Sequence, residues 1–143
     1  YTNTTELNVS QIDSNGNLTI IDSFKYESQR SHGLSVKNDL IVLSSEVTYE
    51  LLTYKLSGST MVNIDSYTEQ NFFIREILYN IPTDTFVVNY GGVIKPFKIS
   101  QDGIILGEIG DYDVYANNMT STYNEKIVNY SDDRIQIIKL DSN

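Results

Sequence analysis

Apolar and polar residues alternate in short runs along the whole chain, and polar turns separate the runs. The alternation has the two-residue period of β-strands, and a helical period is not sustained anywhere. Strand-favouring Tyr, Phe, Ile, Val and Thr are abundant, whereas Ala occurs once, at Ala116. The turns at 13–17 (DSNGN), 57–60 (SGST) and 100–103 (SQDG) contain Gly or Asn, which accept the positive φ angles of hairpins. The pattern predicts an all-β chain with less than ~10% helix.

One strand pattern occurs four times in the sequence. Its equivalent early positions are Leu7, Leu51, Ile94 and Ile135, and its equivalent late positions are Ile12, Leu56, Ile99 and Leu140. The late positions are 44, 43 and 41 residues apart. The motif Ile-Asp-Ser-aromatic also occurs twice, around Asp22 and Asp65. We expect these two aspartates to make one repeated structural hydrogen bond, because a single active site would not need copies.

Two further strand patterns recur with the same period. One is at 38–45, 84–91 and 125–132, and the other is at 33–37, 75–79 and 114–120. Each period of about 43 residues therefore carries four short strands, which is typical of a β-propeller blade. We predict a single domain, 1–143, with repeats at about 14–56, 57–99 and 100–141 and an extra outer strand at 5–13.

The segment SDDRIQIIKLD (131–141) resembles the end of a WD-type repeat, in which a small or acidic turn leads into an outer strand. The segments at 45–57 and 90–100 are looser versions of it. The Trp-Asp dipeptide of that family is absent, and Gly-His occurs only in reverse order, as His32-Gly33. The chain is equally similar to surface propellers with YVTN- or LVIVD-type repeats. The resemblance implies an antiparallel β-propeller fold and carries over no catalytic residues.

Three four-stranded blades are too few for a closed ring, since propellers have about 4–8 blades. The alternatives are part of a larger propeller, one half of a dimeric six-bladed propeller, or an open stack or barrel-like sheet. We expect the strand Glu6–Asp13 to pair with residues outside the chain's own three blades, either a preceding blade or a second copy. The chain starts at Tyr1 without a signal-peptide pattern, so we expect a processed chain, a cut domain or part of a longer protein.

The charge and composition exclude several functional classes. The net charge is −9, from 10 basic and 19 acidic residues, and no Lys/Arg cluster occurs. This balance disfavours nucleic acid and anionic membrane surfaces as partners. The chain has no Cys, so it has no disulfide, thiol nucleophile or zinc–thiolate site. No apolar run approaches the ~18 residues of a membrane span, so we expect no membrane insertion.

The sequence offers few candidates for catalysis or metal binding. His32 is the only histidine, and without a nearby Ser-Asp pattern we expect it at the surface. SDDR (131–134) could be an ion-pair cluster, but a turn explains it. Oxygen ligands for calcium could come from Asp102, Glu108, Asp111 and Asp113, and the alternate positions continue with Tyr115 and Asn117.

The calcium interpretation does not fit the spacing of a calcium loop of the EF type. Such a loop needs Gly at its sixth position and Glu at its twelfth. Counting Asp111 as the first position puts Ala116 and Thr122 there. Alternate polar residues in a strand share one face, which indicates a solvated face. We therefore predict no metal, no cofactor and no catalytic residues.

Five Asn-x-Ser/Thr triplets occur, at Asn3, Asn8, Asn17, Asn118 and Asn129. Random placement of this glycan-acceptor pattern predicts about 2.6 triplets for this composition. The excess favours an extracellular or cell-surface protein, with a cytoplasmic protein as the alternative.

The sequence predicts a non-enzymatic propeller module that binds a protein partner, further blades of the same protein or a second copy. The warrant is the analogy to the propeller fold, whose loops and faces bind partners. One alternative is a subunit of an extracellular or virion surface assembly. The other is a propeller-type hydrolase or lyase that acts on a sugar or lactone.

Overall fold

The computed structural model describes residues 5–26, 33–45, 48–58, 60–68, 73–109, 114–115, 118–123, 126–131 and 134–139. The regular structure of these residues consists of strands, which confirms the predicted all-β chain. The strands are β1 (Thr5–Ile12), β2 (Leu18–Tyr26), β3 (Leu34–Lys37), β4 (Leu40–Ser45), β5 (Glu50–Ser57), β6 (Thr60–Thr68), β7 (Ile74–Asn80), β8 (Thr85–Tyr90), β9 (Val93–Ile99), β10 (Ile105–Glu108), β11 (Val114–Tyr115), β12 (Asn118–Tyr123), β13 (Lys126–Ser131) and β14 (Arg134–Lys139). None of the described residues forms a helix that could cross a membrane.

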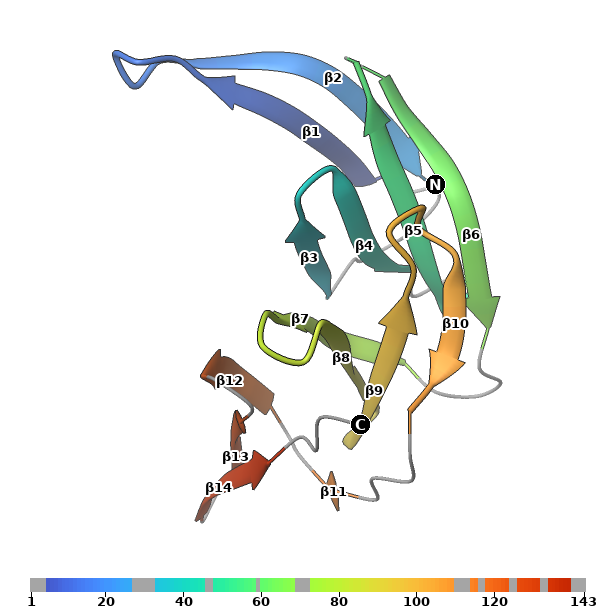
Figure 1. Ribbon diagram of the computed structural model, residues 1–143, viewed down its shortest axis with the longest axis vertical. Coiled ribbons are helices and arrows are strands. Elements are labelled where there is room, and N and C mark those ends of the chain that lie inside the picture. The colour runs from blue at the N-terminus through green and yellow to red at the C-terminus, as the bar shows by residue number, and fades with distance from the viewer. Residues whose placement is uncertain are drawn as a thin grey trace.

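The strands form four antiparallel sheets that follow one another in chain order along an arc (Figure 1). Their strand orders are β1-β2, β3-β4-β5-β6, β7-β8-β9-β10 and β12-β13-β14, and β11 also pairs with β9. First strands of consecutive sheets lie together, β3 against β7 and β7 against β12. The last strands of the first three sheets do the same, β2 against β6 and β6 against β10. Strands of equal rank therefore stack from sheet to sheet.

The pairing register confirms the predicted equivalence of the early positions Leu7 and Leu51 and of three late positions. Leu7 lies opposite Phe24 and Leu51 lies opposite Tyr67, and each pair is followed by a β-bulge at the same place. Three late positions are equivalent in the same way, because the pairs are Ile12 with Leu18, Leu56 with Met61, and Ile99 with Ile105. The fourth late position, Leu140, lies outside the described residues.

In the second and third sheets the repeated strand is the third strand, one position further in than we expected. β5 lies between β4 and β6, and β9 lies between β8 and β10. The reason is the polar turn after each repeated strand, which returns the chain into one more antiparallel strand. The predicted repeats at 14–56 and 57–99 therefore each hold four strands but span two sheets, and the repeat at 14–56, for example, starts with β2 of the first sheet.

The strand Glu6–Asp13 pairs within the chain on one edge, whereas we predicted a partner outside the three repeats. β1 pairs with β2 along its length, from Thr5 opposite Tyr26 to Ile12 opposite Leu18. The turn at 13–17 explains this pairing, because the Asp13 carboxylate accepts hydrogen bonds from the backbone N–H groups of Asn15 (2.8 Å) and Asn17 (2.9 Å). Such a local turn forms at a smaller entropic cost than a distant pairing.

Two apolar clusters fill the spaces between the first three sheets. The larger joins β3–β6 to β7–β10 and includes Leu40, Val42, Leu51, Ile74, Ile77, Phe86, Val88, Tyr90, Phe97 and Ile99. The smaller joins β1 to the other face of β3–β6 and includes Ile41, Leu43, Tyr54 and Met61, with Leu7, Val9, Leu52 and Leu56 packed against it. Both sides of β4 are thus buried, which explains why its sequence is a continuous apolar run instead of an alternation.

Candidate interaction site

The two Ile-Asp-Ser-aromatic motifs form the same joint between consecutive sheets. In the first joint, the Met61 backbone N–H donates to Asp22 Oδ2 across 2.7 Å. In the second, the Ile105 N–H donates to Asp65 Oδ2 across 2.9 Å. The other carboxylate oxygen of each aspartate accepts from the N–H of the serine that follows it, at 2.8 and 2.9 Å. The predicted repeated structural hydrogen bond is therefore confirmed.

The turn between β9 and β10 completes the second joint from the other side. The Thr53 hydroxyl donates to the Gly103 carbonyl oxygen across 2.6 Å, and Gly103 is buried at a φ of +92°. A Cβ atom at Gly103 would lie 3.1 Å from Leu40 Cδ1 and 3.2 Å from Ile64 Cγ2, both in the preceding sheet. Both the close approach and the φ angle favour glycine at this position.

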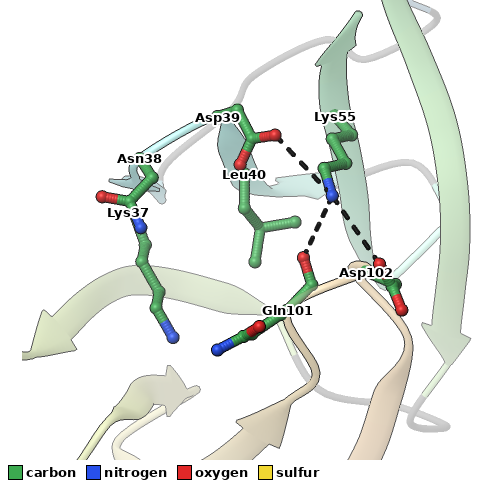
Figure 2. Close-up of a pocket in the computed structure, with 7 residues that line it drawn as sticks. All are labelled: Lys37, Asn38, Asp39, Leu40, Lys55, Gln101 and Asp102. Atoms are coloured by element: carbon green, nitrogen blue, oxygen red, sulfur yellow. Dashed lines mark hydrogen bonds and ion pairs between the residues drawn. The ribbon is translucent and has the colours of Figure 1, made fainter.

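A polar cleft of about 320 Å³ lies above this joint, between the β3–β4 turn and the β9–β10 turn (Figure 2). Lys55 is at its centre, and its Nζ donates to the Gln101 carbonyl oxygen at 3.3 Å. The same Nζ lies 3.7 Å from Asp39 Oδ2 and 3.8 Å from Asp102 Oδ1. Lys37 also lines the cleft but pairs with Asp84, so the two lysines are balanced by carboxylates and the cleft does not favour an anionic ligand.

A second cluster of charges connects the same two sheets. The Lys37 ammonium pairs with the Asp84 carboxylate, and the Tyr79 hydroxyl donates to Asp84 Oδ1 across 2.7 Å. Lys37 Nζ also lies 5.3 Å from the centre of the Tyr79 ring. The main cause of the lowered pKa of Asp84 is the hydrogen bond from Lys37, which outweighs the effect of burial. Burial lowers the pKa of Lys37, but the hydrogen bond and charge of Asp84 reverse this and raise it.

The joint between the first two sheets contains an open apolar groove, the β1 groove, with a volume of about 190 Å³. Its lining residues are Leu7, Asn8, Val9, Leu34, Val36, Asn38, Asp39, Ile41 and Leu56. Leu34 and Val36 are 48% and 52% exposed, whereas their counterpart positions in β7, Ile77 and Tyr79, pack into the larger cluster. The difference arises because β3 and β4 cover the β7 positions, whereas the first sheet consists of β1 and β2 among the described residues.

The residues that the sequence offered for metal binding do not come together among the described ones. Asp102 lies in the β9–β10 turn beside Lys55, whereas Glu108 is in β10, 3.0 Å from Lys95 Nζ. The described residues contain no group of three acidic or histidine side chains that could hold a metal ion. The candidates His32, Asp111, Asp113 and Asn117 lie outside the described residues.

The remaining predicted positions are in strands and turns. Ser131 and Arg134 pair with each other at the ends of β13 and β14, and Asp132 and Asp133 of SDDR lie outside the described residues. Among the glycan-acceptor triplets, Asn8 and Asn17 are exposed, and the Asn17 amide donates to Asp13 Oδ2 at 2.9 Å. Asn118 and Asn129 are in the paired strands β12 and β13, and Asn3 lies outside the described residues.

Sequence reasoning did not identify the β1 groove or the two lysine clusters. Their residues come from strands and turns that are far apart in the sequence; Lys37 and Asp84, for example, are 47 positions apart. The signal that could have pointed to the groove is the pair Leu34 and Val36, whose alternation puts both side chains on one face of β3.

The successive antiparallel sheets, stacked with strands of equal rank together, define a partial β-propeller. The chain is similar to the crystal structure of Hsv2 from Kluyvelomyces marxianus, a β-propeller protein, with a TM-score of 0.59 and 21% sequence identity. The similarity covers 96% of this chain and 42% of Hsv2, so the chain spans less than half of that protein. No protein-family model matches the sequence, and no curated protein matches it. At this identity the similarity shows the fold alone.

Proposed function

We propose that this chain is a non-enzymatic β-propeller module that acts by binding, as a structural or interaction part of a larger protein or assembly. The observation that supports the proposal is the β1 groove. It is an open apolar space at the joint between the first two sheets, whereas β3 and β4 fill the corresponding space at the joint between the second and third sheets. The partial-propeller fold supports it too, because propellers are rigid scaffolds whose surfaces bind other proteins.

The position of the groove corresponds to the place of two β-strands at the equivalent joint. At the equivalent joint, β3 and β4 occupy this place, on the inner side of the repeated strand β5. Within the described residues, β1 pairs on one side only, so its inner edge has backbone groups available for a new strand. An added strand pair would cover Leu34 and Val36 and complete the first sheet as a blade.

The test compares two valine substitutions in the chain purified from cells that make it. Val36 in the groove is 52% exposed, and Val62 on the outer strand β6 is 45% exposed. Val36→Glu should remove the chain from its native assembly, measured by native mass spectrometry after cross-linking, whereas Val62→Glu should leave the assembly intact. Both variants should unfold at nearly the same temperature, because surface substitutions change stability by about 0.5 kcal/mol or less.

Two results would contradict the proposal. One is a wild-type chain that remains monomeric in those cells, or an assembly that Val36→Glu leaves unchanged. The other is steady turnover of a sugar or lactone substrate by the purified chain, which would favour the hydrolase or lyase alternative.

A further inference from the structure

The joint between consecutive sheets occurs twice in complete form and once in open form. In each complete joint, the N–H at the start of an outer strand donates to an aspartate of the preceding sheet, Met61 to Asp22 and Ile105 to Asp65. Leu18 starts β2 at the same register position, opposite the end of the repeated strand. The Leu18 N–H therefore occupies the position from which the Met61 and Ile105 N–H groups donate, and it could be the donor of a third joint.

The turn before Leu18 has the same hydrogen bonds as the turn before Ile105. In both turns the first residue's N–H donates to the carbonyl of the fifth, and the fourth residue's N–H donates to the carbonyl of the first, at 2.9 to 3.0 Å. The fourth residue is a glycine in both, Gly16 at a φ of +84° and Gly103 at +92°. Leu18 and Ile105 are thus structural counterparts.

The open joint differs from the complete joints in what covers its apolar side chains. Leu18 is 70% exposed, whereas its counterpart Met61 is 8% exposed. Ile12 is 67% exposed, whereas its counterpart Ile99 is 3% exposed. These two apolar side chains face outward at the positions where a preceding sheet covers their counterparts.

The glycines of the two turns show the same difference. A Cβ at Gly103 would meet Leu40 and Ile64 of the preceding sheet, at 3.1 to 3.3 Å. A Cβ at Gly16 would have nothing within 4 Å. The β1–β2 turn therefore has the geometry of a joint whose preceding sheet is not among the described residues.

We propose that the face formed by Ile12, Leu18 and the β1–β2 turn docks a β-propeller blade whose outermost strand carries an aspartate, and that this aspartate accepts the Leu18 N–H. The proposal rests on the proposed function. It names the partner of a second surface of the β1–β2 hairpin, which is separate from the β1 groove. The blade covers the apolar side chains of Ile12 and Leu18, as the second sheet covers Ile99 of the third sheet.

A second copy of this chain does not supply that blade. Among the described outer strands β2, β6 and β10, the aspartates are Asp22 and Asp65, and both already accept an N–H of the next sheet. The sheet faces beside these two aspartates are also occupied within the chain. The described outer strands of a second copy therefore lack the free aspartate that the docking blade needs.

The test uses a blade of known sequence as the probe. A copy of residues 1–49, which contains Asp22, replaces residues 1–5 in front of Glu6 of the full chain. The copies of β1 to β4 then lie directly before the native β1 in the sequence. This is the same order in which β1 to β4 lie before β5 in the native chain. The control is the same extended chain with Asp22→Ala in the copy alone.

Amide hydrogen exchange measured by NMR gives the result. In the extended chain, exchange at Leu18 should slow by ~10-fold or more relative to the native chain, and the control should lose this protection. Met61 and Ile105 report that the native joints remain folded. Unchanged Leu18 exchange in an extended chain with protected Met61 and Ile105 would overturn the proposal.

A photo-cross-linker at position 18 of the native chain gives a measurement that does not depend on the folding of the extended chain. In cells that make the protein, the cross-linked peptide should contain an aspartate-bearing strand from outside residues 1–143. A peptide from a second copy of the chain would overturn the proposal. Because Val36 tests the groove separately, failure at Leu18 is distinguishable from failure of the proposed function.

Discussion

Removing the Asp65 carboxylate should weaken the joint between the second and third sheets. Asp65→Ala deletes the acceptor of two backbone N–H groups, those of Ile105 and Ser66, both at 2.9 Å. Hydrogen bonds to a charged group contribute about 1.5–3 kcal/mol each when buried. Asp65 is only half-buried, and the bond from Ser66 is local, so we expect a total loss of about 2 kcal/mol.

The assay combines thermal unfolding with amide exchange. A loss of about 2 kcal/mol should lower the unfolding temperature by roughly 4–8 °C for a chain of this size. Exchange at Ile105 should accelerate, whereas exchange at Met61, which donates to Asp22 in the other joint, should change little. Asp102→Ala is the matched control, because Asp102 is 91% exposed and an exposed ion pair contributes less than about 1 kcal/mol.

The reasoning would be refuted in either of two ways. Equal unfolding temperatures for Asp65→Ala and Asp102→Ala would show that the joint does not stabilise the fold. Faster exchange at Met61 and Ile105 alike would show that the substitution loosens the whole chain instead of one joint.

Two further predictions concern the contact between β3 and the third sheet. Gly33→Ala should destabilise the chain by about 1–3 kcal/mol in a urea titration, because the added Cβ would lie 2.7 Å from Ile77 Cγ1 and 3.0 Å from its backbone N; unchanged stability would show that β7 moves freely at this point. The stabilisation from Asp84 should be complete above its ordinary pKa of 3.8 and decline as the pH falls through the lowered value in the folded chain. In Lys37→Met, the free energy of unfolding should decline less over this acid range than in the wild type. An equal decline in both proteins would contradict the assignment.

The sequence by itself determined the strand content, the period and the positions that repeat. Alternation of apolar and polar residues is a local property, and a strand needs only that alternation to present one face for burial. The sequence also predicted the structural role of the two Ile-Asp-Ser-aromatic motifs, because a repeated motif indicates a repeated contact. Each copy does make the same hydrogen bonds at the same position in its strand. The absence of catalytic residues and cofactors stays a prediction.

The tertiary structure decided which strands share a sheet and which joints are complete. The 43-residue period does not show where one blade ends, since a repeat that spans two sheets has the same period as a repeat within one sheet. The pairing of β1 with β2 was settled by the Asp13 turn, whose hydrogen bonds form locally. The β1 groove and the open face at Ile12 and Leu18 exist because a side chain's burial depends on the neighbouring sheet, and identical positions in the repeat have different neighbours.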